Sequence, residues 1–213
     1  SQGLSHDLKA PLRGVDGYAH ILKEDHFGSL NKEGRMAVDT ILSSVQEMQD
    51  LIDNILSFAG VSNENLSKQV VSTDTMVSDI LKSFNIKSNF SNTSVSIDES
   101  LPKMLGDRRM LGQVWSNLIA NALKYSERSS SPAIEIGYNL KENITVYHIK
   151  DNGIGFDPKY KEEIFNLFSR HSGDNYQGTG IGLAIVKKII EKHNGKIWAE
   201  SEPGKGSAFY FHV

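Results

Sequence analysis

The chain has 213 residues, of which 38% are hydrophobic and 23% are charged, and its formal net charge at pH 7 is -3. This composition is ordinary for a globular protein with one large domain or two small ones, and it gives no electrostatic case for binding nucleic acid or an anionic membrane. The absence of cysteine excludes disulfides and thiolate metal sites. The sequence also contains no apolar run of about 18 residues, the length that a membrane-spanning helix needs.

Two long amphipathic helices are predicted at the start of the chain. Apolar residues recur at helical spacing through residues 1–26 and again through 31–60, and Gly28 ends the first helix. Pro11 lies inside the first helix, where we expect a kink rather than a break, because the periodicity resumes in phase. A helical hairpin alone has little core, so we expect two copies to pair as a four-helix bundle. Docking onto its own chain is the alternative.

His6 lies on the outward face of the first predicted helix. It is two residues from both Leu4 and Leu8, roughly 160–200° around the helix from this apolar stripe. A histidine beside an acid such as Asp7 is usually a solvated surface pair. Held outward on a rigid helix, however, it is also available for chemistry.

A second domain follows a short polar segment, residues 60–65, that is predicted to be a hinge. We therefore divide the chain into domains 1–62 and 63–213. Hairpin connections between helices and strands imply an α+β layer structure, with helices covering one face of a sheet. The predicted strands are 66–71, 93–97, 134–140, 144–148, 196–200 and 207–213, and the predicted helices are 73–87, 105–125, 160–168 and 180–194.

The helix predicted at 105–125, for which Asp107 is a candidate start, carries a polar stripe. Its members share one helical face, because they recur at i, i+4, i+8 and i+11. Amide oxygens are hard ligands and a lysine neutralises phosphate, a combination that suits a magnesium nucleotide; a solvated helix face is the alternative. The stripe consists of Gln113, Asn117, Asn121 and Lys124.

Two glycine-rich segments complete the set of candidate motifs. Residues 151–155, Asp-Asn-Gly-Ile-Gly, follow a predicted strand, and Asp151 can accept a hydrogen bond from an exocyclic amine; taken alone, the segment is more simply an Asn-Gly turn. Residues 178–183, Gly-Thr-Gly-Ile-Gly-Leu, open a predicted helix whose free N–H groups can face phosphate. The spacing fits neither a dinucleotide fingerprint nor a P-loop, so a nucleotide site of another design is predicted.

Together these segments resemble the catalytic core of the bacterial sensor histidine kinases of two-component signalling. Any one motif is weak, but five in the right order are specific, and the resemblance covers nearly the whole chain. The motif around His6 is similar to that of the phytochrome-like branch of this family. The phospho-acceptor H box corresponds to residues 5–12, the N box to 113–125, the G1 box to 151–155, the F box to 164–168 and the G2 box to 178–183.

The resemblance implies a helical hairpin that forms a dimeric four-helix bundle, followed by an α+β sandwich ATP-binding domain of the histidine kinase/Hsp90-like ATPase type. It implies ATP-dependent autophosphorylation of His6 and phosphotransfer to an aspartate on a response regulator receiver domain, with ATP and Mg²⁺ as cofactors. We expect this fragment to be cytoplasmic and homodimeric, and to follow an upstream sensor domain in a longer chain. No nucleic acid partner is expected.

The resemblance also assigns roles at the phosphate end of the site. Asp7 would orient His6 and act as its base. Asn121 would ligate Mg²⁺, and Asn117 would support the phosphate and metal region. Arg170 is a candidate contact of the transferring phosphate, in a polar lid segment.

At the nucleotide end, Lys124 would contact phosphate and Tyr125 the base or ribose. Asp151 would bind the adenine amine, and Thr179 would support the adenine end. The glycines that would shape the pocket and its lid are Gly153, Gly155, Gly178, Gly180 and Gly182.

Two other functions remain open. ATP-hydrolysing relatives of the same fold need a glutamate where Asn117 stands, and an amide is a poor general base, so phosphate is expected to go to His6 rather than to water. The second alternative function is a dimeric signalling scaffold with an inactive nucleotide site. Family members that dephosphorylate their regulator often carry Thr or Asn at the position of Ala10; alanine cannot position a water, so weak phosphatase activity is expected.

Overall fold

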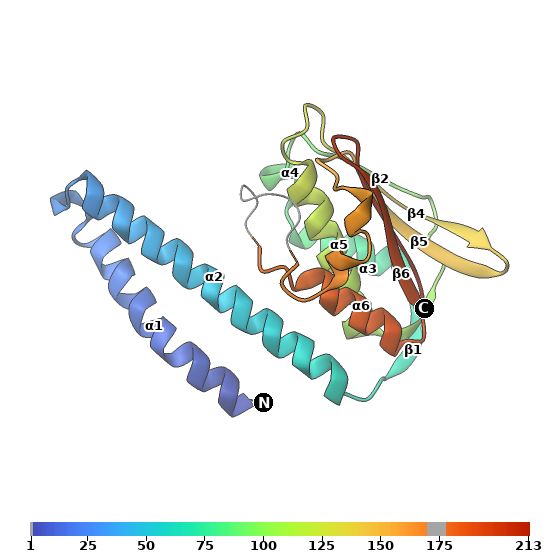
Figure 1. The fold of residues 1–213 in the computed structure, drawn as a ribbon, viewed down its shortest axis with the longest axis horizontal. Coiled ribbons are helices and arrows are strands. Elements are labelled where there is room, and N and C mark those ends of the chain that lie inside the picture. The colour runs from blue at the N-terminus through green and yellow to red at the C-terminus, as the bar shows by residue number, and fades with distance from the viewer. Residues whose placement is uncertain (1, 170–177) are drawn as a thin grey trace. The chain divides into compact units, whose positions relative to one another are not determined.

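The computed structural model describes the backbone of residues 2–169 and 178–213, and the side chains of these residues except 2–8, 63 and 87. The chain forms two compact units, Ser1–Gly60 and Val61–Val213, drawn in Figure 1. Along the described residues, no helix is both long enough and apolar enough to cross a membrane.

The first unit is a helical hairpin. Helix α1 (Gln2–Glu24) leads through a 3₁₀ turn, η1 (Phe27–Ser29), into α2 (Lys32–Asn63), and the two long helices run antiparallel (Figure 1). Between them, Lys23 pairs with Asp39 at 2.9 Å. Helix α1 continues through Pro11, as the phase of the apolar stripe predicts.

The apolar stripe of this hairpin is only partly covered. Among the described side chains of the hairpin, Ala19, Val38 and Val45 are buried, whereas eight large apolar residues remain exposed. An isolated hairpin therefore leaves much of its apolar surface in water, which is unfavourable unless something covers it. The exposed residues are Val15, Tyr18, Ile21, Leu22, Met36, Ile41, Met48 and Ile55.

Helix α2 runs past the expected end at residue 60. Residues 61 and 62 already belong to the second unit, where the Lys192 ammonium donates to the carbonyl oxygens of Val61 (2.5 Å) and Ser62 (3.2 Å). These carbonyls at a helix C-terminus have no intrahelical partner, so the lysine stabilises the additional turn.

A five-stranded sheet organises the second unit, in the order β2-β4-β5-β7-β6. In this sheet β2 and β4 are parallel, whereas the pairs β4–β5, β5–β7 and β7–β6 are antiparallel. A separate two-stranded sheet pairs β1 with β3. The strands are β1 (Lys68–Val71), β2 (Ser94–Ile97), β3 (Met104–Asp107), β4 (Ala133–Lys141), β5 (Ile144–Asp151), β6 (Lys196–Glu202) and β7 (Gly206–His212).

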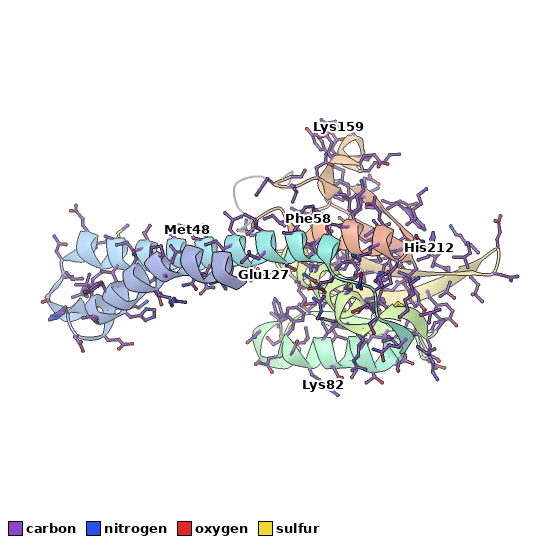
Figure 2. The ribbon with its side chains drawn as sticks, turned by 90° about the horizontal axis from the view of Figure 1, so that it is seen from below. Met48, Phe58, Lys82, Glu127, Lys159 and His212 are labelled. Carbon is purple, nitrogen blue, oxygen red and sulfur yellow. The ribbon has the colours of Figure 1, made fainter. Side chains whose placement is uncertain are left out.

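Helices cover one face of this sheet (Figure 1). In the core between the layers, Trp115 of α5 contacts Tyr147 of β5 and Phe211 of β7, with ring centroids 5.9 and 5.2 Å apart. Figure 2 shows Lys82 and Lys159 pointing outward on opposite sides of this unit. The helices are α3 (Thr73–Ser83), α4 (Ile86–Asn89), α5 (Arg108–Ser126) and α6 (Gly182–Lys192), with the 3₁₀ turns η2 (Pro158–Tyr160) and η3 (Glu163–Phe165).

Three predicted helices differ from the observed ones. The helix expected from residue 105 begins at Arg108, and β3 takes up the preceding residues. Its cap is Asp107, the candidate start, which accepts from the N–H groups of Arg109 and Met110. The helix expected through residue 87 ends at Ser83, and Asn85 then adopts a left-handed conformation before α4. The helix expected at 160–168 is replaced by the two short turns η2 and η3.

Candidate functional site

The polar stripe of α5 lies at the margin of the core. All four predicted members and Tyr125 are half-buried, while the opposite side of the helix is completely covered. The Asn117 side-chain N–H donates to the Gln113 carbonyl at 2.8 Å, which leaves the amide oxygen of Asn117 directed elsewhere. The buried side of the helix consists of Met110, Leu111, Val114, Trp115, Leu118, Ile119, Ala122, Leu123 and Ser126.

Helix α6 begins against this stripe. A Cβ added to Gly182, the first residue of α6, would lie 2.7 Å from Oδ1 of Asn117, so the close approach of the two helices requires glycine. Ile181 at the N-cap provides no side-chain cap for the N–H groups of the first turn. A helix start of this kind, next to half-buried amides, can receive an anion.

Asp151 ends strand β5, next to Ser207 of β7 in the sheet register. Its side chain is buried, and the carboxylate accepts hydrogen bonds from the N–H of Gly153 (2.9 Å) and from the N–H of Ser207. Burial raises the pKa of Asp151 to about 6, although the two N–H groups lower it. An ionised carboxylate accepts about four hydrogen bonds, so it can still receive the exocyclic amine of a base.

The loop at 151–155 is closely enclosed by two other elements. A Cβ on Gly153 would collide with the carbonyl oxygen of Tyr125 at the end of α5. A Cβ on Gly155, which has a left-handed φ of 62°, would collide with the carbonyl oxygen of Glu202 at the end of β6. The Asp-Asn-Gly-Ile-Gly pattern is therefore a steric requirement here, and the turn interpretation alone does not explain it.

The segment that carries the second glycine pattern lies near the same helix. A Cβ on Gly178 would be 2.7 Å from Nζ of Lys124. The Lys124 ammonium also lies 3.4 Å from the Tyr125 hydroxyl and 4.6 Å from the centre of that ring. A cation is thus placed between the end of α5 and the segment that leads into α6.

The predicted residues divide between the two units. Those of α5, of the 151–155 loop and of 178–182, including the half-buried Thr179 and Gly180, lie in the second unit. His6 and Asp7 lie on α1 of the first unit, with side chains outside those described. Arg170 lies outside the described residues.

Two residues of this region were not found from the sequence. Ser207 donates its N–H to Asp151, and Ser201 lies beside it on β6. Only their position at the facing ends of the strands predicted at 196–200 and 207–213 could have drawn attention to them.

Two family models match the chain. Residues 1–64 match "His Kinase A (phospho-acceptor) domain", and residues 106–213 match "Histidine kinase-, DNA gyrase B-, and HSP90-like ATPase".

Curated relatives include cyanobacterial phytochrome B of Nostoc sp., 41% identical over 97% of this chain, and the phytochrome-like protein Cph1 of Synechocystis sp., 40% identical over 98%. The chain spans 28% of the length of each. Among solved structures, full-length ShkA in complex with AMPPNP matches all of this chain and 44% of its own, with 25% identity and a TM-score of 0.74. The Acinetobacter baumannii histidine kinase AdeS matches 98% of this chain and 96% of its own, with 20% identity and a TM-score of 0.67, a likeness of fold.

Proposed function

The chain belongs to the sensor histidine kinases, and from this premise we propose that it transfers the γ-phosphoryl group of ATP to His6 and then to an aspartate of a response regulator. In this proposal residues 1–62 are the dimerisation and phospho-acceptor domain, and 63–213 the catalytic ATP-binding domain. The observation that carries the proposal is the buried Asp151 carboxylate, which has acceptor capacity left and lies in a glycine-lined loop against the end of α5, the helix that carries the amide stripe.

The adenine end of the nucleotide is assigned to Asp151, with Thr179 and Tyr125 beside the base and ribose. A buried carboxylate held by two N–H groups has a fixed orientation, which favours recognition of an amine. The phosphate end is assigned to Lys124 and to the first turn of α6, whose N-cap residue Ile181 provides no side-chain cap; together they provide positive charge and N–H donors.

The donor set suits Mg²⁺ bound together with the nucleotide. Among the described residues there is no cluster of three His, Asp or Glu side chains that would hold a metal alone. Mg²⁺ often takes one or two protein oxygens and completes its shell with phosphate and water, a demand that amides can meet. We assign Asn121 as the protein ligand and Asn117 as its support; the ion would neutralise charge on the phosphates.

The transfer step uses the neutral imidazole of His6. Asp7 accepts the Nδ1–H hydrogen bond, which leaves the Nε2 lone pair free to form a bond to the γ-phosphorus while the bond to the bridging oxygen breaks. ADP leaves with that electron pair, and the Nδ1 proton passes to Asp7, so that the phosphorylated ring is neutral. Lys124 and the N–H groups of α6 hold the departing phosphates.

The exposed apolar surface of the first unit supports a homodimer. We assign the eight exposed apolar residues of the hairpin to a homodimer interface, because pairing two hairpins would bury them as a four-helix bundle. A receiver domain of a response regulator is the acceptor of the phosphoryl group.

A two-step labelling experiment tests the proposal. With γ-labelled ATP and Mg²⁺, the chain should acquire acid-labile, base-stable phosphate, which should then pass to a receiver domain chosen from a panel. Release of inorganic phosphate without labelling of the chain would instead indicate an ATP-hydrolysing relative, and absence of nucleotide binding would indicate a scaffold.

Nucleotide affinity should depend on pH through Asp151. Below about pH 6 the carboxyl becomes protonated and loses acceptor capacity, so affinity should fall about tenfold per pH unit. Calorimetric titration with adenosine between pH 5 and 8 measures this, since adenosine carries no phosphate that titrates in that range. A constant affinity across this range would contradict the assignment of Asp151.

Replacement of Ala10 should expose the missing phosphatase function. Ala10 is exposed on α1, one turn after His6, so Ala10→Thr adds a hydroxyl that can orient a water on the same side of the helix. The rate of phosphate release from the phosphorylated regulator should rise at least about tenfold, a conservative expectation beside the roughly hundredfold or more that a positioned proton-transfer group contributes. Ala37→Thr, at an exposed alanine of α2, is the matched control. Efficient dephosphorylation by the unmodified chain would contradict the prediction.

A further inference from the structure

A row of three polar residues crosses the end of the sheet. Asp151 of β5 pairs with Ser207 of β7, which pairs in turn with Ser201 of β6. Residues paired in this way point to the same face of a sheet, so the row leads from the edge strand directly to the Asp151 carboxylate.

The hydroxyl of Ser201 has a complete set of hydrogen-bond partners. It accepts from the N–H of Phe156 at 2.8 Å and donates to the carbonyl of Gly206 at 2.8 Å. The Ser207 hydroxyl lies 3.1 Å away and becomes the donor of that pair, because the single proton of Ser201 is already used. One donor and two acceptors are the full capacity of a hydroxyl.

These partners belong to the two segments that form the Asp151 site. Phe156 directly follows the 151–155 loop, and Gly206 lies so close to it that an added Cβ would collide with the Asp151 carbonyl oxygen. The N–H of Gly204 also donates to the Ile154 carbonyl at 2.7 Å. The β6–β7 hairpin is therefore bonded to the loop at its turn, through Gly204, and just before the turn, through Ser201.

We propose that Ser201 is a positioning residue of the nucleotide site: its hydroxyl holds the β6–β7 hairpin on the 151–156 segment and thereby keeps the Ser207 N–H on the Asp151 carboxylate. The inference rests on the proposed function of this site. It assigns Ser201 no contact with nucleotide, since the hydroxyl acts through Phe156, Gly206 and Ser207.

Ser201→Ala should weaken binding of ATP analogues about tenfold, because Phe156 loses the acceptor of its N–H and the Ser207 N–H is no longer fixed. A merely structural role would not alter the titration of Asp151. If Ser201 positions the donor, the pKa of Asp151 should rise in Ser201→Ala, because one of the two N–H groups that lower it is weakened. Burial and these two N–H groups are the influences that set this pKa.

The measurements are calorimetry for affinity and carboxyl-carbon NMR for the titration of Asp151 in the nucleotide-free chain. Ser201→Thr keeps the hydroxyl and should restore both values. Ser96→Ala is the matched control, because Ser96 also donates from a strand to a backbone carbonyl, that of Ile134 at 3.3 Å, but on β2 at the other edge of the sheet.

The outcomes separate the two proposals. An unchanged Asp151 titration in Ser201→Ala, with affinity equal to that of the unmodified chain, would overturn the role of Ser201 and leave the nucleotide site standing. If the unmodified chain binds no nucleotide, the proposed function fails, while the NMR titration still decides whether Ser201 positions the donor to Asp151.

Discussion

His6→Gln should abolish phosphorylation of the chain. An amide nitrogen has no available lone pair, so it cannot form the bond to phosphorus that Nε2 of imidazole can form. Glutamine is a good helix former, so α1 should remain intact, and the nucleotide residues lie in the other unit. We expect incorporation of labelled phosphate from γ-labelled ATP to fall to background, at least about a hundredfold, while the affinity for ATP analogues stays unchanged.

A second histidine on the same helix provides the control. His20 lies on α1 and is exposed, with its Nδ1 3.0 Å from the Asp16 carbonyl and 3.4 Å from the Asp16 carboxylate. Chemically it is also a histidine beside an acid, so composition alone does not distinguish it from His6. His20→Gln should keep full labelling. Acid-labile phosphate on His6→Gln, or its loss from His20→Gln alone, would show that the acceptor has been misassigned.

The helices that the sequence predicts best are those whose apolar pattern repeats over many turns. The hairpin of α1 and α2 and the polar stripe of α5 follow from local spacing, which requires no knowledge of distant residues. Strand β3 was missed because three of its four residues, 105–107, fall in the helix predicted from residue 105. Its conformation is decided by pairing with β1, as Lys68 opposite Asp107 illustrates, and such pairing is not visible in a local pattern.

The candidate site, too, can be predicted from the sequence only where its signal is local. Asp151 attracts attention because an acid at a strand end, followed by alternate glycines, suggests a ligand loop. What the glycines must accommodate depends on the Tyr125 and Glu202 carbonyls, which come from other elements. Beyond its place at the end of a predicted strand, Ser201 has no local signal, because its relation to Asp151 exists only through the register of β5, β7 and β6.

Asp151→Asn should abolish nucleotide binding without destabilising the fold. The substitution keeps the shape of the side chain, and the amide oxygen can still accept from the Gly153 N–H. The charge is lost, however, and with it the second acceptor oxygen that would receive the base. We expect affinity for ATP analogues to fall at least about a hundredfold, which is the usual consequence of removing an acceptor that a buried donor of the ligand requires.

The free energy of unfolding of Asp151→Asn should rise at neutral pH, although its nucleotide affinity falls. Raising the pKa of Asp151 from 3.8 to about 6 means that the ionised carboxylate costs the nucleotide-free fold about 3 kcal/mol at neutral pH. A raised pKa favours the folded state at low pH, so this group's contribution is present below pH 3.8 and is lost as the pH rises through about 6. Relative to the unmodified chain, Asp151→Asn should therefore gain free energy of unfolding between pH 4 and 7. Urea denaturation at several pH values measures that difference.

Asp157→Asn tests whether the loss of any carboxylate near the loop is enough to abolish nucleotide binding. Asp157 is a partly exposed cap of η2 that accepts from the Lys159 N–H at 3.0 Å, so its replacement removes the same charge a few residues away. It should bind nucleotide normally. The combination expected for Asp151→Asn, a fold at least as stable at pH 7 with no nucleotide affinity, is what a carboxylate held buried for a ligand predicts. A variant that loses binding and stability together would instead identify Asp151 as a structural residue of the β5 terminus.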